Sequence, residues 1–588
     1  MDLGNRQRWR GVGSSIVLRH RLGNRGRPIA RSYKYTRQAA IRPRIFGSTG
    51  VGASFLRNDP FAAGTGRPFL HRARDLATLA CDRNDWAIHD HRSIALVPGG
   101  YSPRRALHGQ HGPVHRSCHH VSVPVLRFSY RAFAAYVRWK CSHHGCCRRQ
   151  RLFAVPEVRM NERNCVIVDA YSTGRFLPEE FKRYGISTVH VMSAAQIPSI
   201  FQSHFNANLY DEVIRPPERM GYDEIVEYHL RALQGRELEF VIAGCETGVE
   251  LADSISERLG LPSNGTALSA ARRDKSRLSE ALASAGVRSI RQVVSDNAEV
   301  IARWKRQETF DELVIKPLNS TGTEDVFFCS TDADIQRAVT AIVGKTNRVG
   351  TLNQLALGQE KINGQQYTVN AVSIDGETFV TEAWTYDTVP IEGASSVCSL
   401  ERLLGGKEPI VLELSDYLER ALRALRITDG PAHAEIIVDD RGPVLVDFGA
   451  RLQGTMSAKA RTMALGHNHL TLTAWRYADP KGFAGYMRRR GVYKRQAHAL
   501  CVSLISDMGG VVAGYPGLDA IGKLPSFADA IAFVPIGQNL VPTIDLASTP
   551  GIVYLVNNDL IQLEEDYRQL RAMRMDQVFD LVPQEANQ

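Results

Sequence analysis

The clearest pattern along the chain lies in residues 430–449, where two apolar stretches that favour strands flank a short polar segment. The segment 439–442 (Asp-Asp-Arg-Gly) is typical of a tight turn, so the stretch predicts a β-hairpin. A turn centred near residues 440 and 441 places Glu435 opposite Asp447. Two facing carboxylates repel each other and destabilise a sheet, whereas a divalent cation bound between them makes the pair stabilising. The pattern alone leaves two interpretations open: an Mg2+ site, or a surface hairpin whose charges face water.

A second pattern begins abruptly after Met160. Apolar segments that favour strands start near residues 165, 188, 212 and 239, and they alternate with segments that predict helices. Such alternation predicts a parallel α/β layer. Glu246 follows the fourth strand, where open α/β sheets bind ligands, so it is a candidate for holding a substrate ammonium. A charge that simply favours a helix N-terminus is the alternative.

Residues 263–390 favour an antiparallel α+β arrangement. Lys275 lies in the first turn of a predicted helix, where a lysine is ordinarily a solvated charge. Lys316 ends a predicted strand, and residues 319–323 (Asn-Ser-Thr-Gly-Thr) follow it. The amides of such a loop can cradle phosphates, and the lysine neutralises their charge. The loop is not a Walker loop, because the Gly-Lys-Ser/Thr sequence is absent.

The remaining segments give weaker signals. Residues 384–404 predict either the lining of a substrate pocket, with Trp384 or Tyr386 as an apolar wall, or a surface loop. His467 and His469 resemble a metal pair, but two positions apart on a helix they point in different directions. Residues 497–556 are strand-rich with Gly and Pro turns, and residues 559–573 predict a final charged helix.

Composition places the chain among globular proteins. It has 588 residues, of which 44% are hydrophobic and 23% charged, enough for three or four domains. We find no run of 18 apolar residues and no secretory signal, so neither a membrane span nor export is predicted. Five of the ten cysteines lie singly after residue 160, which favours buried thiols in a reduced, cytoplasmic protein.

The net charge of +10 is unevenly distributed. Residues 1–159 hold about 29 Lys and Arg against about 7 Asp and Glu, roughly +22, which leaves about 10 − 22 = −12 for the rest. We expect this Arg- and His-rich leader to be largely disordered or not natively translated, with Met160 as the natural first residue. Its Cys and His clusters match no standard zinc finger. A zinc site, a nucleic-acid tail and a transit peptide are the alternatives.

The order of the motifs resembles the ATP-grasp superfamily, and within it the L-amino-acid ligases that make dipeptides. The resemblance covers roughly residues 160–581. It rests on Lys275, Lys316 with its loop, Gln359-Glu-Lys-Ile-x-Gly, His433-Ala-Glu435 and Asp447-x-x-x-Arg451. It also rests on residues 246–253, 430–435 and 442–447. It implies α/β and α+β classes combined in an ATP-grasp fold: a parallel α/β domain (160–262), two grasp lobes (263–495) and a C-terminal β-rich subdomain with a final helix (496–588).

The resemblance also implies roles for individual residues. Arg451 and Lys316 would steady the transferred phosphoryl group, and Glu435 and Asp447 would bind the metal. The residues expected to hold ATP are Lys275, Lys316, Ser320, Thr321, Gly322, Thr323, Glu360, Lys361 and Ile362. The residues expected to contact substrate are Glu246, Trp384, His433, Arg451 and Gly454. His433 is either a base for the amine or a packed strand residue.

Three positions depart from the family pattern. The second metal carboxylate is Asp447 instead of Glu, which shortens the ligand by one methylene. The Asn often found two residues later is Gly449, so one ligand is absent or replaced by water. The acidic residue expected near the ribose falls at Gln365 or Gln366. These departures concern the fine geometry of the site, not the class of enzyme.

The function implied is an ATP-dependent carboxylate–amine ligase that forms an amide through an acyl-phosphate, with ATP and Mg2+ (Mn2+ as an alternative) as cofactors. Amino acids or other carboxylates are the expected small-molecule partners, and a homo-oligomer is left open. A second hypothesis is another ATP-grasp ligase or carboxylase of specialised or purine-type metabolism. A third, from another class, is a nucleic-acid-associated protein that senses nucleotide.

Overall fold

The computed structural model describes residues 163–391 and 396–582. The predicted leader, its Cys and His clusters and Met160 lie outside the described residues. Within the described part, no helix is long and apolar enough to cross a membrane. The five cysteines in this part are free and buried, as the sequence predicts.

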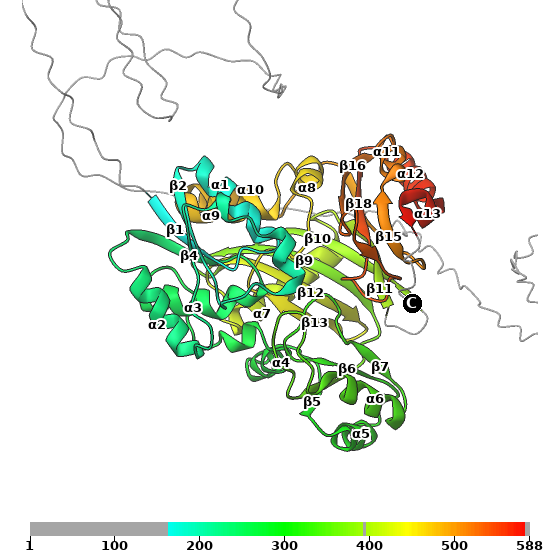
Figure 1. Cartoon of the computed structure of the whole chain (residues 1–588), viewed down its shortest axis with the longest axis horizontal. Coiled ribbons are helices and arrows are strands. Elements are labelled where there is room, and N and C mark those ends of the chain that lie inside the picture. Colours follow the sequence, from blue (N-terminus) through cyan, green and yellow to red (C-terminus); the bar gives the residue numbers. More distant parts are fainter. Residues whose placement is uncertain (1–162, 392–395, 583–588) are drawn as a thin grey trace, which may run out of the picture. The chain divides into compact units, whose positions relative to one another are not determined.

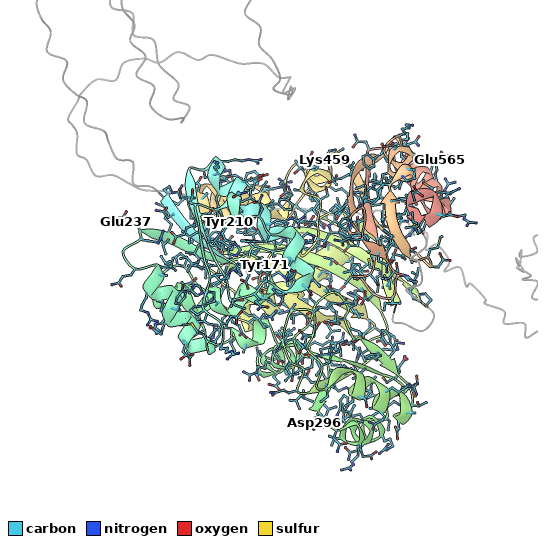
Figure 2. The ribbon with its side chains drawn as sticks, in the orientation of Figure 1. Tyr171, Tyr210, Glu237, Asp296, Lys459 and Glu565 are labelled. Carbon is cyan, nitrogen blue, oxygen red and sulfur yellow. The ribbon has the colours of Figure 1, made fainter. Side chains whose placement is uncertain are left out.

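The N-terminal part is the predicted parallel layer (Figure 1). Its four strands lie in the order β3-β2-β1-β4 and all pair in parallel. The strands are β1 (Arg163–Val168), β2 (Ile186–Val191), β3 (Glu212–Ile214) and β4 (Leu238–Ala243). The helices are α1 (Leu177–Arg183), α2 (Tyr222–Ala232) and α3 (Val249–Arg258). Beyond the strands, Tyr171 and Tyr210 pack around the buried ring of His190 (Figure 2).

A small lobe follows, built on a four-stranded antiparallel sheet in the order β5-β8-β6-β7. Its strands are β5 (Gln292–Ser295), β6 (Leu313–Pro317), β7 (Phe327–Cys329) and β8 (Ala356–Glu360). Helices α5 (Ala298–Gln307) and α6 (Asp332–Ile342) pack on it. Helix α4 (Lys275–Ser284) precedes it, with Leu278 and Leu282 in the main core cluster of the large sheet. The side chain of Asp274 accepts hydrogen bonds from the backbone N–H groups of Ser276 and Arg277, so α4 begins at Lys275.

The large sheet has eight strands in the order β13-β12-β9-β10-β11-β14-β18-β16. They are β9 (Gln365–Ile374), β10 (Glu377–Pro390), β11 (Ser396–Leu403), β12 (Gly430–Asp439), β13 (Gly442–Gly449), β14 (His498–Leu504), β16 (Phe527–Ala532) and β18 (Gly551–Asn557). The hairpin of β12 and β13 confirms the first prediction, because Glu435 is the register partner of Asp447. The prediction that residues 497–556 are rich in strands is also confirmed. Three of these strands, β14, β16 and β18, extend the large sheet instead of forming a separate one.

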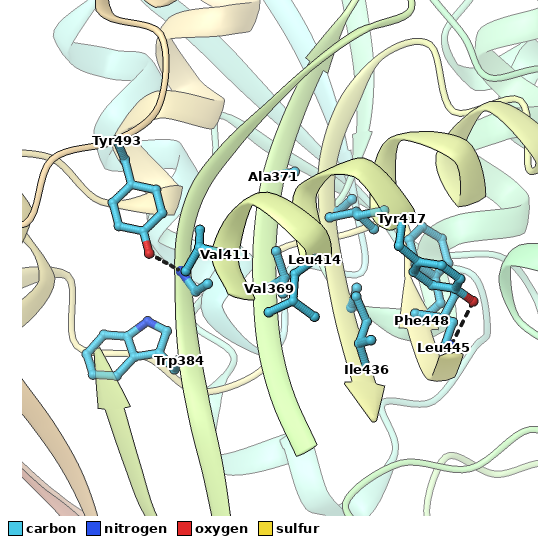
Figure 3. Close-up of a cluster of buried hydrophobic side chains, with 14 of the residues drawn as sticks. Val369, Ala371, Trp384, Val411, Leu414, Tyr417, Ile436, Leu445, Phe448 and Tyr493 are labelled. Atoms are coloured by element: carbon cyan, nitrogen blue, oxygen red, sulfur yellow. Dashed lines mark hydrogen bonds between the residues drawn. The ribbon is translucent and has the colours of Figure 1, made fainter. Parts of the chain in front are cut away.

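Helices cover both faces of the large sheet. On one face, α7 (Pro409–Ala424) packs on Val369 and Ala371 of β9 (Figure 3). On the other, Val372 packs against α9 (His469–Ala478) and α10 (Pro480–Arg490). The remaining helices are α8 (Ala458–Leu465), α11 (Pro516–Ile521), α12 (Leu560–Ala572) and α13 (Met575–Val578), and a three-stranded sheet joins β15 (Gly510–Gly514), β17 (Asn539–Leu540) and β19 (Asp580–Val582).

Candidate active site

The two carboxylates of the β12–β13 hairpin lie among polar and cationic partners. Gln366 of β9 donates from Nε2 to Glu435 Oε2 at 2.9 Å. The Nζ atom of Lys275 lies 3.3 Å from Asp447 Oδ1. The repulsion expected between facing carboxylates is therefore offset by an ammonium group and by an amide donor. One of the two glutamines that replace the expected acidic residue thus contacts a carboxylate of the site.

The two predicted lysines reach the hairpin from different elements. Lys275 is the first residue of α4, and Lys316 lies in β6. Lys275 also donates from Nζ to the carbonyl of Ser320 at 3.1 Å. Lys316 is 9% exposed and donates from Nζ to the carbonyl of Val446 at 3.3 Å. The structure thus brings together the two lysines and the two carboxylates that the sequence singled out.

Charge controls the protonation of this cluster. The pKa of Lys316 is lowered to about 8, mainly by burial and also by the neighbouring Lys275 ammonium, whereas Asp447 and Glu435 act to raise it. Burial acts to raise the pKa of Asp447, but the ammonium groups of Lys275 and Lys316 outweigh it and hold that pKa below its usual value. The two lysines therefore keep Asp447 ionised, whereas burial makes the charged form of Lys316 less favourable.

Arg451 lies just after β13, against Glu246 of the N-terminal part. Its Nε donates to Glu246 Oε2 at 2.7 Å, and the Nη1 of Arg273 lies 3.1 Å from Glu246 Oε1. Burial acts to raise the pKa of Glu246, but the two guanidinium groups outweigh it and hold that pKa low. Both carboxylate oxygens are thus engaged by arginines. A substrate ammonium, which the sequence predicts at Glu246, would have to compete with these two arginines for the carboxylate.

Arg273 is a residue that sequence reasoning missed. It lies two positions before Lys275, but a single arginine ahead of a predicted helix carries no signal of its own. Its ion pair joins segments 27 residues apart in sequence, and it depends on the packing of the N-terminal part against the segment just before α4.

Gly449 gives a physical reason for the departure from the expected asparagine. A Cβ atom placed on Gly449 would lie 2.9 Å from Arg451 Cζ and 3.0 Å from Glu246 Oε2. Contacts that short force a neighbour to move. The missing side chain leaves the space in which Arg451 and Glu246 pair.

His433 is packed in β12. Its ring is 8% exposed, its Nδ1 lies 2.9 Å from Asn370 Oδ1, and its Nε2 lies 3.8 Å from Glu435 Oε1. Asn370 donates in turn to Glu382 at 2.9 Å and to Gln453 at 2.8 Å. These contacts favour the packing interpretation, in which His433 supports the hairpin from a buried polar network.

Trp384 requires a correction. Its side chain is fully buried in the main hydrophobic cluster, beneath the guanidinium of Arg461. A side chain enclosed by the core does not face an open pocket, so Trp384 does not form such a wall in this structure, and the predicted wall is left to the half-buried Tyr386. Residues 384–390 and 396–403 are strands of the large sheet, not a surface loop.

Gly454 and the predicted hinge lie at the borders of the site. The carbonyl of Gly454 accepts a hydrogen bond from Thr173 Oγ1 at 3.0 Å. Glu360 binds Arg291 through its side chain, and Lys361 pairs with Glu312. Ile362 is 9% exposed and packs against the hydrophobic cluster of Ile290 and Val444. The three hinge side chains thus have partners of their own, which leaves ligand contacts to their backbone.

The donor set fits Mg2+. Glu435 and Asp447 offer carboxylate oxygens, and within the described residues no group of three or more His, Cys, Asp or Glu side chains gathers as a metal cage. Mg2+ suits such a site, because it usually keeps several waters and is bound by one or two carboxylates together with substrate phosphates. His467 and His469 each bond to backbone carbonyls, as expected for packed histidines.

Comparison with known proteins finds ligases that share sequence and fold with this chain. No protein-family model matches the chain. Dapdiamide A synthase of Enterobacter agglomerans is 29% identical over 423 residues, which cover 71% of this chain and 97% of that protein. The crystal structure of an L-amino acid ligase from Bacillus licheniformis matches with a TM-score of 0.56 and 17% identity, and covers 72% of this chain and all of that one. The chain is thus similar in sequence to amino-acid ligases and has the fold of the ATP-grasp ligases.

A second curated relative points to the same group of ligases. The L-arginine-specific L-amino acid ligase of Bacillus subtilis is 23% identical over 173 residues, 29% of this chain and 41% of that protein. The predicted fold class is confirmed, since the parallel N-terminal sheet and the antiparallel lobes are those of the ATP-grasp fold. ATP-grasp ligases generally use ATP with Mg2+.

Proposed function

We propose that the chain is an ATP-dependent ligase that joins a carboxylate to an amine through an acyl-phosphate and releases ADP and phosphate. The observation that carries the proposal is the meeting of Lys275, Lys316, Glu435 and Asp447 beside the Arg451–Glu246 pair. The relatives named above support it, because their names describe amide synthesis and amino-acid ligation. Amino acids, or carboxylates of similar size, are the proposed substrates.

In this proposal the chain acts mainly by positioning charge. Phosphoryl transfer to a carboxylate spreads negative charge over the phosphoryl oxygens, so cations matter more than an acid or a base. Lys275 and Lys316 hold the ATP phosphates, and Arg451, oriented by Glu246, steadies the acyl-phosphate. Mg2+ bound by Glu435 and Asp447 supplies further positive charge at the phosphates, with Mn2+ as an alternative metal.

Two further segments complete the proposed site. Backbone groups of residues 360–362 hold the adenine ring, since the side chains there are engaged elsewhere. Residues 320–323 close over the terminal phosphate, because an acyl-phosphate hydrolyses readily and water must be excluded. The amine then attacks the acyl carbon, the C–N bond forms, and the bond to the phosphate oxygen breaks.

A panel of amino-acid pairs scored by phosphate release tests the proposal. We expect release that depends on ATP, on a divalent metal and on both substrates. Lys316→Ala and Glu435→Ala should abolish ADP formation, whereas Lys459→Ala, on an exposed face of α8, should not change it. Turnover only with bicarbonate or a nucleotide precursor would assign the chain to another ATP-grasp reaction. Near-normal ADP release by either site variant would refute the site.

A further inference from the structure

The loop proposed to cover the phosphates has a strained backbone. It connects β6 to β7, and three of its residues have a positive φ angle: Gly322 (69°), Thr323 (58°) and Asp325 (51°). Threonine and aspartate adopt this left-handed conformation only at an energetic cost. Contacts outside the loop must therefore maintain its shape.

One set of contacts comes from the same lobe. Glu324 is 5% exposed, and its carboxylate accepts a hydrogen bond from Ser320 Oγ at 2.5 Å and one from the backbone N–H of Arg348 at 2.9 Å. Asn347 donates from Nδ2 to the carbonyl of Asn319 at 2.7 Å. The loop is thus fastened at both ends to residues 347 and 348.

A second set comes from the C-terminal part. Arg348 donates from Nη2 to Asp545 Oδ2 at 2.6 Å, and Asp545 is 7% exposed. The backbone N–H of Leu546 donates to Thr323 Oγ1 at 3.0 Å. These two bonds join segments 197 and 223 residues apart in sequence. They connect the small lobe to the end of the chain at the strained loop itself.

The C-terminal segment is itself well held. Ser548 donates to Asp545 Oδ1 from its backbone N–H at 2.8 Å and from its Oγ at 2.7 Å. The backbone N–H of Thr543 donates to the carbonyl of Ser506 at 2.8 Å, and the N–H of Ser506 donates back to Thr543 Oγ1 at 3.1 Å. Residues 543–549 therefore present a fixed surface to the loop.

The loop links this surface to the candidate active site, because the carbonyl of Ser320 accepts the bond from Lys275 Nζ. We propose that Arg348 and Asp545 are positioning residues of the ligase: they hold the phosphate loop closed, so that the acyl-phosphate meets the amine before it meets water. The proposal rests on the proposed function, but the closed state of the loop is measurable without turnover.

Asp545→Asn tests the proposal, since it keeps the shape of the side chain and removes the charge that binds Arg348. Hydrogen exchange of residues 319–326 should become about tenfold faster without nucleotide, as expected for the loss of a charge-assisted bond. Binding of Mg2+ with the non-hydrolysable analogue AMP-PNP should weaken about tenfold. Asp576→Asn is the matched control, because it removes an exposed ion pair with Arg574 that does not touch the loop.

Coupling gives the functional readout. With the amino-acid pair that gives the highest phosphate release in the wild type, Asp545→Asn should form less amide for each ADP released. Thr323→Val removes the acceptor for Leu546, together with the bond that the hydroxyl donates to the Gly322 carbonyl at 2.7 Å, and should act in the same direction. Because it leaves residues 543–549 unchanged, it separates the contact from any unfolding of that segment. Arg348→Gln also removes the guanidinium whose Nε lies 3.9 Å from Glu324 Oε1, so the double variant Arg348→Gln/Asp545→Asn should be no worse than Arg348→Gln alone.

Unchanged exchange of residues 319–326 in both Asp545→Asn and Thr323→Val would overturn the proposal. Faster exchange with an unchanged ratio of amide to ADP would also overturn it, since the contact would then serve stability alone. Failure of the proposed function looks different, because the wild type itself would neither bind AMP-PNP nor release phosphate with any amino-acid pair.

Discussion

At the scale of single residues, the proposed site would work through arginine and lysine side chains that carboxylate partners already hold in place. Arg451 depends on Glu246, and Lys275 depends on Asp447. A guanidinium that is already ion-paired loses little conformational entropy when it binds an anion, so the carboxylates contribute to binding before any substrate arrives.

The space at Gly449 gives a prediction about Arg451. In Gly449→Ala, the new Cβ meets the flexible ends of Arg451 and Glu246, not backbone atoms, so these side chains should move while the hairpin stays folded. We expect kcat to fall at least about tenfold, the loss of roughly one oriented charge-assisted hydrogen bond. Kinetics together with the melting temperature measure this.

Gly514→Ala is the control, because a Cβ there meets nothing within 4 Å. A Gly449→Ala enzyme with unchanged kcat would show that the Arg451–Glu246 pair does not assist the reaction. An unfolded variant would show that the hairpin, and not the pair, depends on the glycine.

The lowered pKa of Lys316 predicts a pH dependence. In the free protein this lysine loses its proton as the pH rises through about 8. Phosphates favour the charged lysine, so AMP-PNP binding with Mg2+ should weaken from pH 7.5 to 9.5 and should take up protons in that range. Calorimetry at pH 8.5 in buffers of different ionisation enthalpy measures the uptake, and Lys316→Gln should abolish it.

The same shift affects folding, with a definite sign. Between pH 8 and the ordinary lysine pKa of 10.5, the unfolded chain keeps a proton that the folded chain has lost. The contribution of Lys316 to the free energy of unfolding therefore rises with pH across this range. As the pH rises, nucleotide binding should therefore weaken while the contribution of Lys316 to stability increases. A general loss of structure at high pH would instead lower both.

The residues of the site were predictable in part. Lys275, Lys316, Glu435 and Asp447 could be placed because each sits at a local signal: a helix start, a strand end or a hairpin register. Arg273 and the burial of Trp384 could not be, because both depend on how separate elements pack.

At the scale of elements, the hairpin is braced by helix α7. Tyr417 donates from its hydroxyl to the carbonyl of Arg288 at 2.7 Å and accepts from the backbone N–H of Leu445 at 2.8 Å (Figure 3 shows the second bond). Tyr417 is 1% exposed and lies in the main core cluster. One side chain thus ties the helix, the hairpin and the start of the small lobe together.

Tyr417→Phe should lower the free energy of unfolding by about 1–3 kcal/mol, because it leaves a buried N–H and a carbonyl without partners. Denaturant unfolding measures the change. Tyr228→Phe, half-buried on α2, controls for the loss of a hydroxyl elsewhere. If Tyr417→Phe lowered the free energy of unfolding no more than the control does, water would be replacing the hydrogen bonds of the Tyr417 hydroxyl.

Local chemistry was enough to predict most elements but not the order of strands. The parallel sheet and the β12–β13 hairpin were predictable from periodicity and turn residues. The pairing of β11 with β14 was not, because no turn joins them and no local signal selects the partner of an edge strand.

At the scale of the whole described chain, the large sheet makes the C-terminal residues part of the grasp lobe. Leu400 of β11 pairs with Val502 of β14, and both side chains lie in one apolar cluster. The expected boundary near residue 496 therefore separates segments that share a sheet and a core.

A chain that ends at residue 495 should consequently be insoluble. It would expose the edge of β11 and the apolar side chains that β14 covers, and such an edge promotes aggregation. The soluble fraction after expression, compared with the full chain, measures this. A soluble shortened chain with one cooperative unfolding transition would show that the lobe folds without its last strands.

The same pairing has a consequence for synthesis on the ribosome. The partners of β11 in β14 lie about 100 residues later, which at 5–20 residues per second means a delay of about 5–20 s. Throughout that delay the nascent lobe carries an open strand edge. Translation speed after β11, and the availability of chaperones that shield such edges, should therefore govern how much of the newly made enzyme reaches its active form.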